Sequence, residues 1–493
     1  MIAVSIMCPT STGISNVLQA LLRLSISGST RRNVLRDKFK NQVVKVNTGE
    51  SGPMRDTHDS KEIQLTTGRS GHCLNSTQCF SPDGKMIVYD GRNDDSLLAA
   101  NGEVYLLDLT TGQEKLIYRT EHQSAFGPGA GAATFSPDGT MVLFLGGIQN
   151  CNKERPYSFT RRTGIGVELK RPMIPVWMDA RDITPPFTPG ALRGGTHAHT
   201  WSGDGKWISF TYNDHILAEA SARGEQVTDT RTVGIMFPGK VKVKNADGVE
   251  EKDGRMHAVL VSRVVQCPKP GSDEVAKAFD ECWIGLNGYK KTDGDWQKRA
   301  IAFQGHLVDK DGKLKTEIFV ADIPENLPEL AVRFPSAGTP STLPEVPPGI
   351  VQRRISFSKK GVSSIPRHWL RSVPDGSLIG FLAEDEQGIV QLWGISPNGG
   401  RLRQLTFLST SISSPFNFSP DGKWVAYMSD ERVFITRLSD AKTLELTKKR
   451  KEKLAGAVVW SPQGDAVIYN RYTSEGDDVL LQVFMVKIEL KNE

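Results

Sequence analysis

The chain of 493 residues is poor in cysteine, and its six cysteines show neither CxxC pairing nor regular spacing. This pattern argues against a zinc ribbon and against a dense disulfide framework. Cys73 and Cys79 are close enough in sequence to bridge in an oxidising compartment, but buried free thiols are the expected state.

An excess of one charge is also absent. The 61 Lys and Arg residues nearly balance 56 Asp and Glu residues, which leaves a net charge of +5 and argues against a nucleic-acid partner. Familiar catalytic patterns are missing as well. No serine nucleophile elbow and no pair of catalytic carboxylates stands out, and the glycine-rich residues 126–131 lack the Gly-Lys-Ser ending of a phosphate loop.

The N-terminus lacks a clean targeting signal. Its first 22 residues carry no charged side chain, but Pro9 and Gly13 interrupt them and no basic residue precedes them. The stretch is too polar for a membrane span. We expect residues 1–58 to be a poorly ordered extension and linker, and residues 59–493 to be the folded domain. A degenerate export signal stays open, so the sequence does not decide between the cytoplasm and the periplasm.

What the chain has in plenty is glycine and proline, arranged in a repeated unit. An aromatic residue, Ser, Pro, Asp and Gly precede an apolar strand, in full or in part, at residues 80–85, 135–139, 201–206, 374–376, 418–423 and 460–464. Pro and Asp suit the early positions of a reverse turn and Gly the position with positive φ, so each unit predicts a hairpin of two strands. The last three copies are spaced in the forties, as for one four-stranded propeller blade each.

A second repeat indicates how the ring closes. Residues 354–357, 404–406 and 445–447 each end a unit, whereas the similar residues 64–66 follow no unit and the final unit lacks such a strand. We therefore expect the N-terminal strand to complete the last blade, which removes two exposed sheet edges.

The gap between the third and fourth copies predicts one further, degenerate blade. We assign the strand-like residues 256–261 and 317–321 to it, with an insertion around residues 264–297. The fold class is thus all-β, a seven-bladed propeller, and an eight-bladed ring is the less economical alternative.

Histidines gather on one end of the predicted blades. His197 and His199 enter the first strand of the third copy, and period-two alternation predicts that they share a face, roughly 7 Å apart. His368 fills the slot of His197 in a distant blade, His215 ends a second strand, and His72 has the same parity as Gln78. Five of the nine histidines therefore map to one rim of the ring.

One hypothesis for this rim is a metal site with His197, His199 and His368 as ligands. His215 and Gln78 are further candidates, and neutral imidazoles suit Mn, Zn, Fe or Ni. The alternative is that these histidines are hydrogen-bonded pocket residues without a metal.

A second group of residues suggests an anionic substrate. Arg193, Arg367 and Arg371 lie near the same rim and can hold a carboxylate through paired hydrogen bonds, with Gln78 and His72 as further substrate-binding candidates. In a lyase, Arg193 would stabilise an enolate-like intermediate while His215 or Tyr212 removes the α-proton.

The repeat resembles those of TolB-like (WD40-like) propellers. Irregular segments covering most of residues 60–490 are similar to the YidR-like bacterial propeller family: MDARDIT (178–184), TPGALRGGTHAH (188–199), SFTYNDH (209–215), PGSDE (270–274), GIVQRR (349–354) and PRHW (366–369). A more distant similarity is to oligogalacturonate lyases. These seven-bladed propellers use histidines and a glutamine to hold a divalent metal that binds a uronate carboxylate during β-elimination. Only the His-x-His is shared, and Gly194 stands at the glutamine's position.

These observations lead to two functional hypotheses of different classes. The first is a metal-assisted lyase or hydrolase acting on a small anionic substrate such as a uronate oligosaccharide. The second is a non-catalytic module of the TolB type, in which the same rim docks a protein partner.

Overall fold

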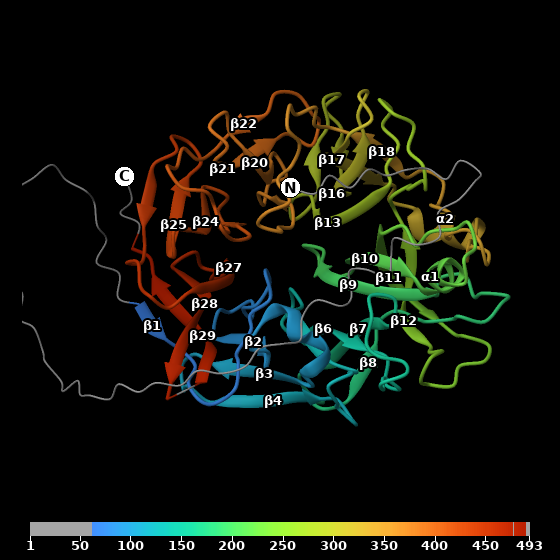
Figure 1. The fold of residues 1–493 in the computed structure, drawn as a ribbon, viewed down its shortest axis with the longest axis horizontal. Helices are drawn as coiled ribbons and strands as arrows, with labels where there is room; N and C mark the ends of the chain where they lie inside the picture. The colour runs from blue at the N-terminus through green and yellow to red at the C-terminus, as the bar shows by residue number, and fades with distance from the viewer. Residues whose placement is uncertain (1–61, 477, 490–493) are drawn as a thin grey trace, which may run out of the picture. The chain divides into compact units, whose positions relative to one another are not determined.

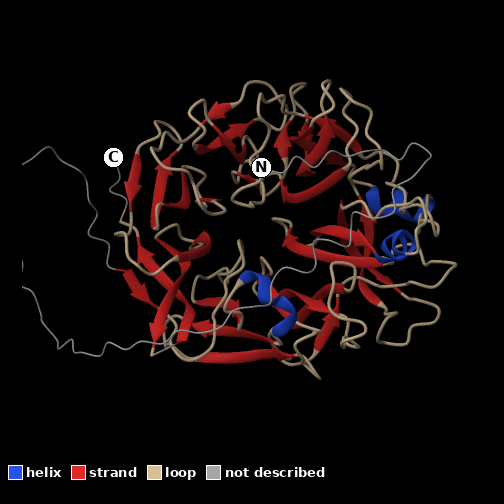
Figure 2. Ribbon diagram, in the orientation of Figure 1, coloured by secondary structure: helices blue, strands red, loops and turns tan. Residues whose placement is uncertain are grey.

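The computed structural model describes residues 62–476 and 478–489, and the predicted extension over residues 1–58 lies outside them. Seven sheets stand around a central axis as the blades of a β-propeller (Figure 1). Strands make up most of the ring, and the helices are few and short (Figure 2). The all-β, seven-bladed fold predicted from the repeat is confirmed.

The blades are named here in chain order, each from its innermost strand. The first three blades are β2 (Met86–Asp90), β3 (Glu103–Asp108) and β4 (Glu114–Arg119); β5 (Ala130–Phe135), β6 (Met141–Gly147), β7 (Arg162–Glu168) and β8 (Pro175–Trp177); and β9 (Gly194–Trp201), β10 (Ile208–Asp214), β11 (Thr232–Val241) and β12 (Gly254–Leu260). In the first blade, Phe80 adds an isolated bridge to Ile87 on the inner side of β2.

The remaining blades follow the same antiparallel order. They are β13 (Lys277–Trp283), β16 (Arg299–Val308), β17 (Leu314–Ile323) and β18 (Val351–Arg354); β19 (Arg371–Ser372), β20 (Ile379–Glu384), β21 (Val390–Ile395) and β22 (Arg403–Gln404); β23 (Asn417–Phe418), β24 (Trp424–Ser429), β25 (Arg432–Arg437) and β26 (Thr443–Glu445); and β27 (Leu454–Trp460), β28 (Ala466–Glu475), β29 (Asp478–Lys487) and β1 (Glu62–Gln64).

Four elements lie outside these sheets. They are a separate two-stranded hairpin of β14 (Tyr289–Lys290) and β15 (Trp296–Gln297), the helices α1 (His215–Ala222) and α2 (Leu327–Arg333), and the 3-10 helix η1 (Asp95–Ala100). No helix among the described residues is both long and apolar enough to cross a membrane.

The repeated turn folds as its residues predict. In the third blade, Ser202 Oγ donates to the Asp204 carboxylate at 2.6 Å and accepts the Trp207 amide at 3.0 Å. Gly205 then adopts φ +67°, which glycine reaches without a Cβ penalty. The turn thus joins the inner two strands, and the aromatic residues that flank it enter the core.

The core lies between neighbouring sheets. In the largest cluster, Trp207 and Phe237 of the third blade pack with Phe303 and Phe319 of the fourth. The Phe303 and Phe319 rings stack at 5.7 Å. Because each sheet buries both faces against its neighbours, the blades are held as one ring.

The blade predicted to be degenerate, which is the fourth in chain order, contains other strands than the sequence-based assignment gave it. Residues 256–261 do not belong to the degenerate blade, because β12 pairs with β11 and forms the outer strand of the third blade. The innermost strand of the fourth blade is instead β13, which lies within residues 264–297, the segment expected to be an insertion. A search for the repeat misses β13 because Trp283 is followed by Ile284-Gly285-Leu286-Asn287 and not by the Ser-Pro-Asp-Gly turn. Within this blade, among the described residues, the hairpin of β14 and β15 is the one pair of strands added to the blade pattern.

A bulge in the innermost strands changes the direction of the rim side chains. Ala198 has φ +58°, and the register shows His197 opposite Thr211 but Thr200 opposite Ser209, so Ala198 and His199 together face a single residue. The simple alternation that predicted a shared face for His197 and His199 is therefore broken. Ala132 and Asp280 bulge in the same way in the second and fourth blades.

The ring closes as predicted. Strand β1 pairs antiparallel with β29, so Glu62 lies opposite Val486 and Gln64 opposite Phe484. The first described strand thereby completes the last blade. Glu62 reinforces this contact, since it accepts hydrogen bonds from Tyr469 Oη and, at 3.0 Å, from Arg471 Nε. The Arg471 side chain is only 1% exposed.

Replacing Glu62 by alanine should weaken ring closure. The change leaves the buried Arg471 guanidinium without its carboxylate, for which we expect a loss of about 3 kcal/mol in the free energy of unfolding. Urea denaturation followed by circular dichroism measures it. The matched control is Glu225→Ala, which breaks an exposed pair with Arg223 and should cost about 0.5 kcal/mol. Equal effects of the two changes would contradict the assigned role of Glu62.

Candidate functional site

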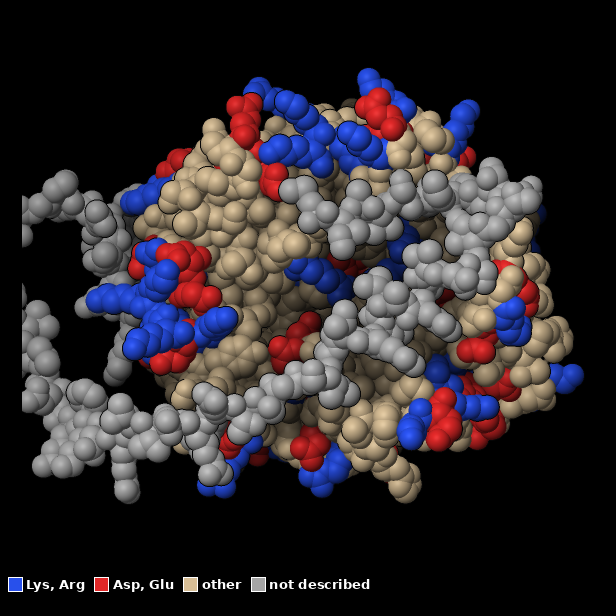
Figure 3. All heavy atoms as spheres, viewed as in Figure 1, with Lys and Arg blue, Asp and Glu red and all other residues tan. Residues whose placement is uncertain are grey.

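A cavity of about 400 Å³ opens where β13 begins, at the end of the blades opposite the Asp-Gly turns. Three blades line it, through Asn213, Asp229, Arg231, Lys277, Phe279, Asp280, Gln304, His306, Thr316, Ser363, Ser364, Arg367 and His368. Lys and Arg atoms, with Asp and Glu atoms beside them, are visible around the centre of the ring (Figure 3). The cavity walls are thus predominantly polar and charged.

Two arginines, Arg231 and Arg367, line this cavity, and a third, Arg162, lies close to them. Arg231 and Arg162 both lie over the ring of Phe159, at 5.6 and 4.8 Å, and Arg231 Nε donates to the Asn213 side chain at 3.3 Å. Arg367 makes a two-pronged contact with Asp280, at 3.1 and 2.6 Å. Burial and the neighbouring charges of Arg367 and Arg162 lower the pKa of Arg231, so the three guanidinium groups repel one another.

Part of this positive charge has no partner within the protein. Arg162 is 4% exposed and donates from Nη1 to Tyr157 Oη at 3.1 Å, but its Nε and Nη2 meet no acceptor among the described residues. A buried guanidinium with unmatched N–H groups is costly, and an anion that accepts from them removes that cost. The cluster of Arg162, Arg231 and Arg367, called the arginine cluster below, therefore favours an anionic ligand.

His197 lies beside the arginine cluster and is neutral. Burial, followed by the charges of Arg162, Arg231 and Arg367, holds its pKa well below the usual range. Its Nδ1 is buried and has no hydrogen-bond partner among the described residues. A neutral imidazole of this kind can accept or share a proton without adding to the local positive charge.

Glu281 supplies a carboxyl group with an unusual pKa next to the cavity. It is 1% exposed, follows Asp280 in β13, and accepts a hydrogen bond from Thr211 Oγ1 at 2.6 Å. Burial raises its pKa to about 7. Thr211 is also the residue opposite His197 in the β9–β10 register, so Glu281 and His197 lie on the same side of that sheet. A carboxyl group whose pKa lies near neutral pH is suited to proton transfer.

The three predicted metal ligands do not converge. His199 turns toward the second blade, where its Nε2 lies 2.9 Å from Thr196 Oγ1 and beside Gly164. His368 uses both ring nitrogens, since Nδ1 lies 3.0 Å from the Pro366 carbonyl oxygen and Nε2 accepts the Leu382 amide at 3.0 Å. Within the part of the chain that the structure describes, no group of three or more His, Cys, Asp or Glu residues could hold a metal ion. The donor set therefore does not fit the predicted site.

Arg193 and Tyr212, which were predicted to be catalytic, instead make buried contacts that hold the fold together. Arg193 is buried and forms an ion pair with Asp214 at 2.7 Å, and Tyr212 Oη donates to the same carboxylate at 2.9 Å. Arg193 also donates to the Thr342 carbonyl oxygen at 2.9 Å, which ties down the loop before β18. His215, the third predicted residue, begins α1 with Nδ1 3.2 Å from Thr160 Oγ1.

Gln78 and Arg371, predicted to bind substrate, instead hold a segment that crosses the channel. Residues 76–78 form this crossing segment. Gln78 bonds both backbone atoms of Trp201 in the third blade, at 3.1 and 3.2 Å, while Arg371 of the fifth blade donates to Ser76 Oγ at 2.9 Å. Asn417 of the sixth blade donates to the Ser76 carbonyl oxygen at 2.8 Å. Since Trp201 lies on the turn side of His197, the crossing segment gives the channel a floor below the arginine cluster.

Of the other two residues predicted to bind substrate, one lines the cavity and one does not. Arg367 lines the cavity as expected. His72 is buried in the first blade, where its ring packs against Tyr89 at 5.0 Å and Nε2 lies 3.4 Å from Glu114. Sequence reasoning missed Arg162, Arg231 and Glu281. Asp280 alone carried a signal, because it precedes Trp283 by three residues as Ala198 precedes Trp201.

Replacing Glu281 by glutamine should change how stability depends on pH. Because the folded chain binds this proton more tightly than the unfolded chain, its stabilisation is complete below the usual pKa of 4.5 and is lost as the pH rises through about 7. We expect the free energy of unfolding of the wild type to fall over that window by up to about 3 kcal/mol more than that of Glu281→Gln. Urea titrations at a series of pH values measure this. If the free energies of unfolding of the wild type and of Glu281→Gln changed in parallel with pH, the raised pKa of Glu281 would be contradicted.

Replacing His368 by alanine should affect stability and not metal content. The change leaves the buried Leu382 amide without an acceptor, for which we expect a loss of about 2 kcal/mol. Elemental analysis after incubation with Mn, Zn, Fe and Ni salts compares the wild type with His368→Ala and His197→Ala. Stoichiometric metal in the wild type that disappears in His368→Ala would overturn the structural role of His368.

Comparison with known proteins assigns the family. The chain is 36% identical over 410 residues to the uncharacterized protein YidR of Escherichia coli (strain K12), with 81% of this chain and 92% of that protein covered. A family model described as a protein of unknown function (DUF3748) matches residues 129–250. Similar solved structures include an oligogalacturonate lyase in complex with manganese (TM-score 0.49, 11% identity, 88% of this chain and 94% of that chain) and the oligogalacturonate lyase of Vibrio parahaemolyticus (TM-score 0.48, 12% identity, 88% and 95%). The chain belongs to the YidR family.

Proposed function

We propose that the cavity at the start of β13 binds a small carboxylate-bearing substrate such as a uronate saccharide. The observation that supports this is the arginine cluster, in which a buried guanidinium keeps unmatched N–H groups beside two further arginines. Guanidinium groups pair with carboxylates in two-pronged geometry and with more specificity than lysine provides. Arg367, the most exposed of the three, is the first that an incoming anion meets.

The reaction that suits this arrangement is a β-elimination. The group that takes the proton from the carbon next to the carboxylate is Glu281 in its ionised form or the neutral His197, and a double bond then forms as the C–O bond at the next carbon breaks. The leaving oxygen takes up a proton. The arginines stabilise the negative charge that develops on the carboxylate during the step.

Two arginine variants test the binding step. Arg231→Gln and Arg367→Gln each remove one charged donor, and we expect each to weaken the binding of di- and trigalacturonate about tenfold or more, as measured by isothermal titration calorimetry. The matched control is Arg119→Gln on β4, which lies away from the cavity and should leave affinity unchanged. Failure of the wild type to bind any uronate would contradict the proposed substrate. If an acidic protein segment binds and loses affinity in the same variants, the site is an interaction surface instead.

A further variant tests the chemistry separately. Glu281→Gln keeps the shape of the side chain but cannot accept a proton. We expect uronate affinity to stay within about threefold and formation of the unsaturated product, followed by ultraviolet absorbance, to fall at least about a hundredfold. Unchanged turnover would remove Glu281 from the reaction and leave His197 as the base, which His197→Gln then tests.

A further inference from the structure

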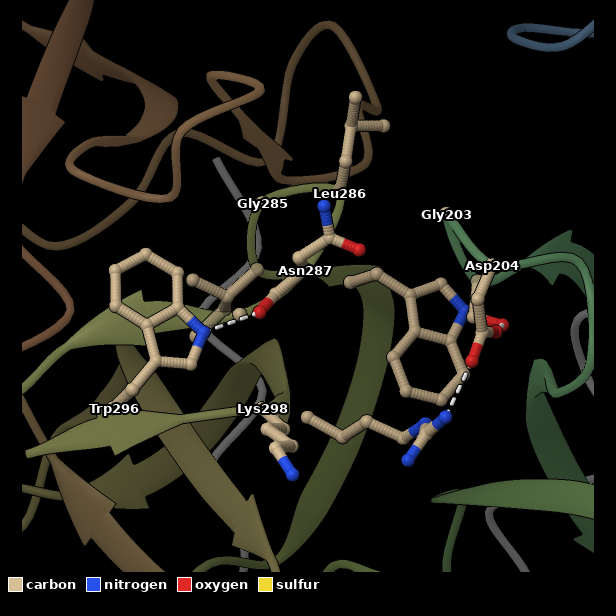
Figure 4. A pocket seen from close by; sticks show the side chains of 12 residues that line it. Gly203, Asp204, Gly285, Leu286, Asn287, Trp296 and Lys298 are labelled. Atoms are coloured by element: carbon tan, nitrogen blue, oxygen red, sulfur yellow. Dashed lines mark hydrogen bonds and ion pairs between the residues drawn. The ribbon is translucent and has the colours of Figure 1, made fainter.

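A second pocket lies at the other end of the same blade. Strand β13 begins at the arginine-lined cavity and ends at a pocket of about 280 Å³, roughly 20 Å away along the strand. Its walls come from the Asp-Gly turn of the third blade, the chain after β13, and the start of β16. Figure 4 shows Trp296 and Asp204 on opposite sides of it, with Leu286 and Asn287 above and Lys298 below.

The pocket is built on a hairpin that is added to the blade pattern. Among the described residues, only the fourth blade carries an added hairpin, β14 with β15, and Trp296 begins β15. Its indole is 51% exposed, although Nε1 donates to the Asn287 carbonyl oxygen at 2.7 Å. The ring therefore keeps one orientation while an apolar face stays open to solvent.

Neighbouring blades hold in place the loop after β13 that forms one wall of the pocket. The Leu286 amide donates to the Pro374 carbonyl oxygen at 2.8 Å, and the Gly285 amide donates to Ser372 Oγ at 3.0 Å. On the third-blade side, Gly203 lies so close to Leu286 that a Cβ at residue 203 would meet the Leu286 carbonyl oxygen at 2.2 Å. A ligand therefore pays little to order the loop, which favours binding by a preformed surface.

The charges around the pocket cancel. Arg299 is paired with Asp204, and Lys298 Nζ lies 2.6 Å from Glu325. The Asn287 side-chain amide is exposed and makes no hydrogen bond to any residue that the structure describes, so its donors and its acceptor are available. The walls thus combine an exposed aromatic face with uncharged and charge-balanced polar groups, unlike the arginine-lined cavity.

We propose that this pocket binds a single neutral sugar residue. A pyranose ring has an apolar face of C–H groups that stacks on an indole, and hydroxyl groups at its edge that bond to amide, carboxylate and guanidinium groups. The balanced ion pairs give a carboxylate on the ligand no net attraction. A volume of about 280 Å³ lies at the low end for ligand pockets and fits a single sugar unit better than an extended peptide.

Ligand-observed NMR with the full-length protein tests the proposal. The probes are the methyl glycosides of glucose, galactose and mannose, each beside the corresponding uronate. We expect at least one neutral glycoside to receive saturation through its ring C–H groups, and Trp296→Ala to weaken that binding about tenfold. Phe407→Ala, which removes another exposed aromatic side chain (69% exposed), is the matched control and should have no effect.

The outcomes separate this pocket from the arginine-lined cavity. Binding of a neutral glycoside that survives Arg367→Gln and is lost in Trp296→Ala supports the proposal, whatever becomes of the uronate site. No binding of any neutral glycoside, or equal binding by the wild type and Trp296→Ala, overturns it. Binding at this pocket of the uronates alone, seen as uronate binding that is lost in Trp296→Ala, also overturns it, because the charge balance of the pocket would then be the wrong description.

Discussion

The pairing of β1 with β29 is the interaction on which the rest of the ring depends. It places the first described strand in the last blade, so that the sheet whose innermost strand is β27 is built from both ends of the described chain. Glu62 and the buried Arg471 add a charged contact to the backbone ladder. This closure maintains the spacing of the blades that line the arginine-lined cavity and the pocket at the end of β13, because each sheet is packed against two neighbours.

The two ends of the fourth blade have opposite physical character. At the start of β13, the arginine cluster carries positive charge that the protein does not fully match. At its end, each charged side chain that lines the pocket beside Trp296 has a partner of opposite sign. The length of β13 itself separates the two environments, because the cavity lies at its start and the pocket at its end. One blade can thus serve two ligands of different charge.

A local backbone feature decides which side chains reach the cavity. The bulge at Ala198 sends His197 toward the fourth blade and His199 toward the second, and a similar bulge at Asp280 accompanies Glu281 and the Asp280–Arg367 pair. Straight strands would have given a histidine pair on one face. The bulges instead assemble a site from arginines, one neutral imidazole and one carboxyl group of raised pKa.

The sequence by itself determined the architecture. Turn residues act locally, so the repeated Ser-Pro-Asp-Gly unit predicted six blades, and the matching strands at residues 64–66 and 404–406 predicted ring closure. The seventh blade was inferred from the gap between the third and fourth copies, and of the two segments assigned to it only residues 317–321 belong to it. The site was only partly predictable: Arg367 and the position of His197 follow from blade slots, whereas Arg162, Arg231 and Glu281 belong to no repeated pattern. Only the tertiary structure decided their meeting, because it depends on a bulge of one residue and on contacts between blades such as Thr211 with Glu281 and Arg367 with Asp280, which are far apart in the sequence. The same is true of His368, whose two ring nitrogens are occupied by backbone groups that no sequence pattern reveals.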